Sequence, residues 1–138
     1  MGVRVTPLKT LRAELGTKLA AGVSVNGKQA KSAPLGALVN APAVVVQSNP
    51  GDYVTALDYC SDRVQFDAIL IAPPGDPAAV ADAFDDMIDQ VRATLRTIAP
   101  SGLKYEFRSV GGFTTYPSGD NDLPAALTTI AVTRNNDA

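Results

Sequence analysis

The sequence predicts an α+β domain in which two helices pack on one face of a mainly antiparallel sheet. Two segments carry apolar residues at helical spacing, and each begins at a proline. Four further segments are rich in β-branched residues or alternate between polar and apolar residues. The elements follow the order α-β-β-α-β-β, and 138 residues are enough for one core. We therefore expect a single domain over residues 1–138.

The first helix is expected over residues 7–21. Thr6 supplies a hydroxyl N-cap and Pro7 the first helical residue. Leucines then recur every three or four positions, as on the buried face of a helix. Gly16 weakens the helix slightly, and Gly22 is expected to end it.

Residues 22–40 are expected to form an extended loop. The segment is rich in Gly, Ala and Ser and shows no clear period, and connections of this length are usually functional or ordered by a partner. The stretch "VSVNGK" within it has the residues of a short strand followed by an Asn-Gly turn. We predict that the segment is disordered in the free subunit.

A long antiparallel hairpin is expected over residues 41–72. Its first strand, "APAVVVQ" at 41–47, contains a β-branched run. Its second strand spans 59–72, where polar and apolar residues alternate before the wholly apolar "ILIA". One end of this strand therefore has a face in water, and the other end is buried. The connection at 48–58, with its proline–glycine turn, is expected to form the hairpin tip.

The second helix is expected to begin at Asp76 and Pro77, which repeat the cap-and-proline arrangement. An apolar stripe runs from Val80 to Ile98 on one face. The other side carries Asp82, Asp85, Asp86 and Asp89. These aspartates lie early in the helix and arginines lie late, which matches the helix dipole. The proline and glycine at 100–102 are expected to end it.

Two more strands are expected to complete the sheet. Polar and apolar residues alternate over 103–110, and the glycines at 111–112 indicate a bulge or bend. The stretch 113–124 has the composition of a turn-rich connection. A strand at 125–134 then closes the sheet, and 135–138 are expected to form a loose tail.

The composition is that of a globular protein, since 46% of residues are hydrophobic and 19% are charged. No apolar stretch approaches the roughly 20 residues that cross a bilayer, and the first residues lack the apolar segment of a signal peptide. Cys60 is the only cysteine, which rules out an internal disulfide and favours a reducing compartment. We expect a protein made in the cytoplasm, with no membrane partner.

Several residue types that enzymes and nucleic-acid binders need are missing. The chain has no His and no Trp, which removes the commonest general base and a base-stacking platform. In "APPGDP" the prolines donate no backbone hydrogen bonds and Asp76 occupies the helix cap, so the turn disfavours a bound phosphate. The aspartates at i,i+4 spacing lack a further ligand type, and Cys60 lacks a histidine partner. We expect no catalysis, no cofactor and no metal.

The charges are unevenly distributed along the chain. Residues 1–40 carry six basic and one acidic residue, whereas residues 41–91 carry nine aspartates and one arginine. Complementary charged patches steer and register association. The pattern is typical of a protein whose ends meet different partners or copies of itself; the alternative is solvated faces that differ by chance.

The order of the elements resembles that of the tail terminator proteins of long-tailed phages, the family that includes the lambda tail terminator. The resemblance covers roughly residues 5–134 and is one of pattern, without a diagnostic motif. The stretches that carry it are "LKTLRAELGTKLA", "APAVVVQSNPGDYV", "DRVQFDAILIAPPGDPAAVADAFDDMIDQVRATL" and the last pair of strands.

The resemblance implies a structural virion protein at the junction of tail and neck. Members of the family form a ring, usually a hexamer, that caps the growing tail tube and ends its polymerisation. The ring then docks to the connector or stopper protein on the head side. DNA passes through the lumen without being read. The expected partners are therefore copies of the chain, the tail tube protein and the head-side connector.

Contacts in such an assembly are expected from the basic segment, from the 48–58 tip and from aromatic residues near turns, since exposed aromatics often anchor interfaces. The candidate residues are Arg4, Lys28, Lys31, Asp52, Tyr53, Tyr59, Phe113 and Tyr116. The alternative is that the tyrosines only cover the end of the sheet.

Two other functions stay open on the sequence. Head-completion or stopper proteins of the same neck have similar size and composition. A small ligand-binding domain is the candidate from a different class, and it predicts a saturable thermal shift with a small molecule.

Overall fold

Two helices and a six-stranded sheet dominate the computed structural model, which describes residues 7–49, 51, 53–58, 61–98, 103–119 and 121–135. The helices are α1 (Leu8–Ala21) and α2 (Pro77–Leu95). The strands are β1 (Ser24–Val25), β2 (Lys28–Gln29), β3 (Lys31–Ala33), β4 (Ala43–Ser48), β5 (Val54–Asp58), β6 (Ser61–Ile71), β7 (Leu103–Ser118) and β8 (Asn121–Asn135). The architecture is mixed α+β, but β1, β2, β3 and β5 interrupt the predicted order of elements.

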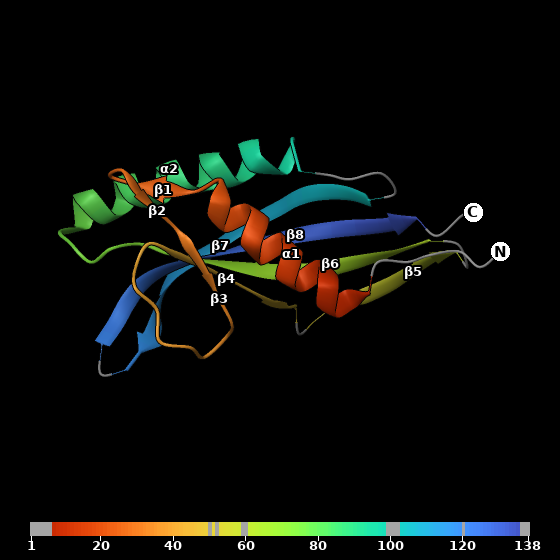
Figure 1. The fold of residues 1–138 in the computed structure, drawn as a ribbon, viewed down its shortest axis with the longest axis horizontal. Helices are drawn as coiled ribbons and strands as arrows, with labels where there is room; N and C mark the ends of the chain where they lie inside the picture. Colours follow the sequence, from red (N-terminus) through yellow and green to blue (C-terminus); the bar gives the residue numbers. More distant parts are fainter. Residues whose placement is uncertain are drawn as a thin grey trace.

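The large sheet is mixed rather than antiparallel throughout. Its strand order is β3-β4-β6-β8-β7, and β5 pairs with the first half of β6 (Figure 1). The pairs around β6, β7 and β8 are antiparallel, whereas β3 and β4 are parallel. The loop at 34–42 carries the chain back along the sheet before β4 begins, and this return makes the β3–β4 pair parallel.

Both helices cover the same face of the sheet (Figure 1). Leu15 of α1 and Met87 of α2 are buried in one apolar cluster with strand residues that include Val46, Phe66 and Ile130. The apolar stripe predicted for α2 is therefore the side that faces the sheet. No helix within the described ranges is long and apolar enough to cross a membrane.

Helix α1 begins one residue later than predicted. Pro7 occupies the N-cap position with φ −58° and ψ 148° and makes no side-chain cap; the predicted cap, Thr6, lies outside the described residues. Gly22 ends the helix, but its φ of −93° is not the left-handed conformation of a glycine C-cap. Close packing gives the physical reason for a glycine here, since an added Cβ would lie 2.0 Å from Thr94 Oγ1.

The loop predicted over 22–40 is shorter than expected. Strands β1 and β2 form a hairpin around Asn26 and Gly27, whose φ values of 51° and 80° are those of the tight turn that Asn-Gly favours. The short strand and turn predicted in "VSVNGK" are therefore present. Strand β3, which was not predicted, joins the edge of the large sheet, and Val23 and Val25 are buried in the main core. Disorder of this segment in the free subunit stays a prediction, which amide exchange measures.

The predicted hairpin over 41–72 is present, because β4 pairs antiparallel with β6 from Ala43↔Ile71 to Ser48↔Phe66. Its connection is not a projecting tip, however. After a break in the pairing, β5 continues along β6 in the same direction as β4, from Val54 opposite Val64 to Asp58 opposite Ser61. The strand was missed because five residues flanked by turn sequences carry little periodicity of their own, and pairing with β6 supplies the hydrogen bonds.

Helix α2 begins where predicted but ends at Leu95, before the predicted end at 100–102. The Asp76 side chain accepts a hydrogen bond of 2.9 Å from the Ala79 backbone N–H, and Pro77 is the first helical residue. Phe84 and Val91 are buried on the face towards the sheet. Local sequence signals were therefore enough to locate this helix and its buried side.

The last two strands are longer than predicted and form one long hairpin (Figure 1). The stretch 113–124 is not a turn-rich connection, because 113–118 continue β7 and 121–124 begin β8. The predicted irregularity at the glycines is present as a register shift between Val110 and Phe113. Pro117 is tolerated because β7 is an edge strand of the sheet.

Candidate functional site

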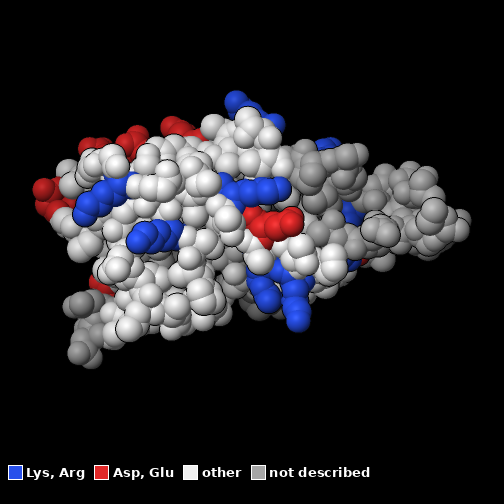
Figure 2. Space-filling view, in the orientation of Figure 1, with Lys and Arg blue, Asp and Glu red and all other residues white. Residues whose placement is uncertain are grey.

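A basic surface lies on the side of the molecule formed by α1 and the short strands. It consists of Lys9 and Arg12 on α1, Lys28 on β2 and Lys31 on β3, all exposed. None of the four forms an ion pair with another described residue. Figure 2 shows Lys and Arg side chains spread over this face. The side chains are thus free to meet acidic groups of a partner.

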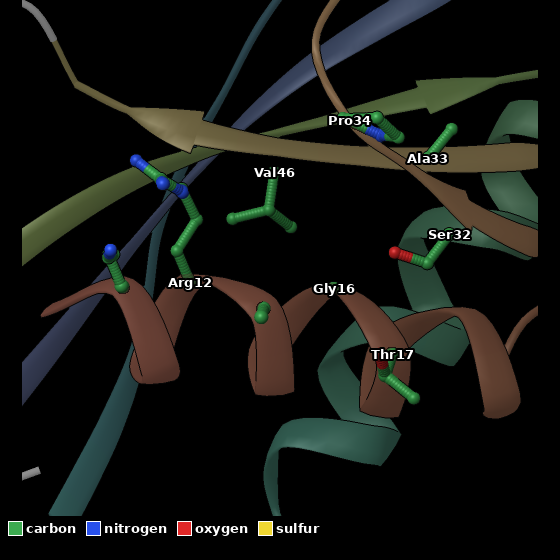
Figure 3. Close-up of a pocket in the computed structure, with 9 residues that line it drawn as sticks. Arg12, Gly16, Thr17, Ser32, Ala33, Pro34 and Val46 are labelled. Atoms are coloured by element: carbon green, nitrogen blue, oxygen red, sulfur yellow. The ribbon is translucent and has the colours of Figure 1, made fainter. Parts of the chain in front are cut away.

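A groove of about 330 Å³ runs between α1 and the sheet edge formed by β3 and β4. Arg12 points from α1 towards the sheet at one end, and Ser32 faces the groove near Gly16 (Figure 3). Val46 of β4 and Pro34 also line it. Helix α1 can approach β3 this closely because a Cβ on Gly16 would lie 2.9 Å from Ser32 Oγ.

Leu35 lies beside this groove and is 60% exposed. It lines a neighbouring depression together with Arg12, Pro34 and Val46. Exposure of a large apolar side chain such as Leu35 to water is unfavourable, and burial against a partner would remove this cost. We refer to Leu35 with Arg12 as the Leu35 edge.

An acidic helix face lies on α2. Asp82, Asp85, Asp86 and Asp89 are all exposed, and none forms an ion pair in the part of the chain that the structure describes. Figure 2 shows acidic side chains gathered along the margin over α2. The acidic residues therefore gather on one helix, while the basic residues lie on α1 and the short strands.

An apolar hollow of about 390 Å³ lies between the start of α2 and the edge strand β7. Phe113 stacks on the buried Phe84 with ring centroids 5.0 Å apart, yet it is itself 66% exposed. Pro77, Val80 and Pro124 also line the hollow. We refer to this site as the Phe113 hollow, and Asp85 borders it because it lies one helical turn beyond the lining residue Ala81.

The structure divides the predicted contact residues into three groups. Arg4, Asp52 and Tyr59 lie outside the described residues, as does Cys60. Lys28, Lys31 and Phe113 are exposed, as an interface role requires. Tyr53 and Tyr116 are not exposed anchors.

Tyr116 is only 5% exposed and ties the loop at 34–42 to the sheet. Its hydroxyl accepts a hydrogen bond of 2.9 Å from Gly36 N and donates one of 3.2 Å to Ala37 O. Tyr53 is half-buried and packs edge-on against Phe66 at 5.8 Å. For both tyrosines the structural role is the observed one, because each side chain fills space within the chain.

The face of the sheet opposite the helices carries a polar network around Asp67, which is 4% exposed. Its carboxylate accepts hydrogen bonds from Asn49 Nδ2 at 2.8 Å and from Thr129 Oγ1 at 3.4 Å. Nearby on the same strand, Arg63 Nε is buried without a hydrogen-bond partner. The sequence placed these residues on a wet strand face. It did not predict that Asp67 is buried there, since that depends on neighbouring strands.

The turn before α2 carries no ligand-binding arrangement among the described residues. The Asp76 carboxylate itself takes the hydrogen bond that a phosphate would accept at the helix N-terminus. The described residues contain no group of three or more potential metal-ligating side chains. Arg134 on β8 forms an ion pair with Asp62 on β6 and joins these two strands. The hydrogen bond to Asp62 raises the pKa of Arg134 above its ordinary value.

The site residues that the sequence did not identify are Arg12, Leu35 and Asp85. The available signal for Leu35 was an apolar residue between turn residues in "SAPLGA".

Comparison with models of known protein families and with curated protein sequences found no match. The surfaces themselves therefore carry the functional argument.

Proposed function

We propose that the chain is a structural subunit of a closed ring in a phage neck, of the tail terminator kind. The observation that carries this proposal is the pair of oppositely charged surfaces on one small domain: the basic surface at α1 and β3, and the acidic helix face of α2. Each has exposed, unpaired side chains among the described residues. Self-association explains both surfaces at once.

Ring assembly needs one patch of a subunit to meet a different patch of the next. Strands β3 and β7 form opposite edges of the five-strand path through the sheet. Helix α1 packs against β3 and β4, whereas α2 packs against β7 and also against α1 and β1. The basic residues of α1 and the acidic residues of α2 therefore belong to different surfaces of the domain, which supports head-to-tail contacts that repeat around a ring.

The role in the neck is tested by electron microscopy of virions made without this chain. A tail terminator predicts tails of uncontrolled length, because the tube then continues to polymerise. Filled heads that leak DNA beside normal tails would assign the chain to the head-completion or stopper position instead. Virions with tails of normal length and intact heads would contradict both neck roles.

The structural role also predicts the response to small molecules. A ring subunit without a ligand site is expected to show no saturable thermal shift with nucleotides, sugars or divalent cations. A shift that saturates with one such compound, and that Arg12→Ala in the groove abolishes, would favour a ligand-binding domain. Lys104→Ala, which removes a cation on β7, is the matched control.

A further inference from the structure

Two separate surfaces of the chain have matching chemistry. The Leu35 edge is an exposed leucine beside the basic Arg12, where the loop after β3 passes α1. The Phe113 hollow is an exposed apolar depression between α2 and β7, with the acidic Asp85 one helical turn from its lining residue Ala81. A protein interface is typically an apolar centre with a polar or charged rim. Both surfaces have an apolar centre, and their charges are opposite.

We propose that successive copies of this chain join head to tail, with Leu35 of one copy seated in the Phe113 hollow of the next. Arg12 of the first copy then faces Asp85 of the second. This inference rests on the proposed ring assembly and names the contact that builds it.

The apolar part of the contact follows from exposure. Leu35 is 60% exposed and Phe113 is 66% exposed, and a hollow of about 390 Å³ has room for a leucine side chain beside the phenylalanine ring. Burial of both side chains removes apolar area from water. Phe113 is already held by its stack on Phe84 at 5.0 Å, so it loses little side-chain freedom when a partner arrives.

The charged part of the contact selects the partner and its orientation. A second Leu35 edge would bring Arg12 against Arg12, and a second Phe113 hollow would bring Asp85 against Asp85. Both like-with-like contacts are repelled. Only the contact between different surfaces pairs opposite charges, which makes the interface heterologous.

Two single substitutions test the inference through complementation. Leu35→Asp places an acid opposite the acidic rim, and Phe113→Asp removes the apolar floor of the hollow. Each variant alone is expected to weaken self-association roughly thirtyfold or more, as for an interface hot spot, and to sediment as a monomer where the unaltered chain forms larger species. An equal mixture is expected to form dimers and nothing larger, because each dimer joins the intact hollow of one variant to the intact leucine of the other.

Controls separate an interface effect from a folding effect. Leu57→Asp introduces the same substitution at another exposed apolar residue, on β5, and is expected to leave assembly unchanged. If Phe113→Asp unfolds the chain, as judged by circular dichroism, Ala81→Glu gives the same readout, because it puts an acidic side chain on an exposed lining residue of the hollow and leaves the Phe84 stack in place. It is likewise expected to form only dimers with Leu35→Asp.

The outcomes distinguish this inference from the proposed function. Rings that persist in both variants, or folded variants that stay monomeric when mixed, would overturn the inference while the neck role stands. An unaltered chain that remains monomeric at all concentrations would also overturn it. Variants that behave as expected, together with normal tails in virions lacking the chain, would retain the interface and overturn the neck role.

Discussion

Helices α1 and α2 lie on the same face of the same sheet, but different features supplement their packing there. Helix α2 has a capping aspartate, a proline at its first position and a continuous buried stripe. Helix α1 has no side-chain cap, and its buried stripe is three leucines, Leu11, Leu15 and Leu19. Two glycines then allow close fits to its neighbours, Gly16 against Ser32 and Gly22 against Thr94. The comparison teaches that both helices are placed by an apolar stripe, which a cap supplements in α2 and close backbone fits supplement in α1.

The largest expected effect is at Gly22, where α1 meets α2. Gly22→Ala puts a Cβ 2.0 Å from Thr94 Oγ1 and 2.9 Å from its Cγ2, so rotation of Thr94 only exchanges one clash for another. We expect a loss of about 3 kcal/mol in the free energy of unfolding, measured by urea denaturation. The double variant with Thr94→Ala is expected to recover most of the loss; no recovery would show that the clash with Thr94 is not the cause.

The cap of α2 is expected to contribute less. Asp76→Ala removes the hydrogen bond to Ala79 N and is expected to cost about 1 kcal/mol in the free energy of unfolding. Asp82→Ala, a matched change at an exposed aspartate of the same helix, is expected to cost under about 0.5 kcal/mol. Equal effects of the two variants would mean that the cap does not stabilise α2.

The pKa of Tyr105 on β7 depends on burial and on the charge of Glu14 on α1. Its hydroxyl is buried without a hydrogen-bond partner among the described residues, and burial, followed by the nearby Glu14 carboxylate, raises the pKa of Tyr105 above 10.0. Its folded-state pKa is raised, so its contribution to stability is present below pH 10 and is lost as the pH rises through the folded value.

Tyr105→Phe tests this pH dependence. At pH 7 the variant is expected to unfold with a free energy equal to that of the unaltered chain or up to about 1 kcal/mol higher, because no hydrogen bond is lost. Above pH 10 its stability is expected to fall less steeply with pH. Urea denaturation between pH 7 and 11 measures both effects, and identical pH profiles would contradict the raised pKa.

The smallest effect is expected at Gly16. Gly16→Ala brings a Cβ to 2.9 Å from Ser32 Oγ and 3.6 Å from Val46 Cγ2. Ser32 is exposed, so its hydroxyl can rotate away, while alanine favours the helix by about 0.5–1 kcal/mol. We expect a net change within about 0.5 kcal/mol in thermal or urea unfolding. A loss above about 1 kcal/mol in the free energy of unfolding would show that Ser32 cannot move away from the new Cβ.

The candidate surfaces were predicted only in part. Lys28, Lys31 and Phe113 are exposed as the sequence indicated, whereas Tyr116 is buried. An aromatic residue near a turn looks the same in sequence whether it faces solvent or a returning loop. Tyr116 faces the returning loop at 34–42, because the backbone of that loop is hydrogen-bonded to the Tyr116 hydroxyl.

The sequence by itself determined the elements whose signals are local: helix α2 with its cap, strands β4 and β6, the Asn26–Gly27 turn and the separation of basic from acidic segments. Only the tertiary structure decided that β3 and β5 are strands and that β7 and β8 form one long hairpin. It also formed the Leu35 edge and the Phe113 hollow from residues distant in sequence. Short strands gain their hydrogen bonds and burial from partners distant in sequence, so no local pattern can specify them.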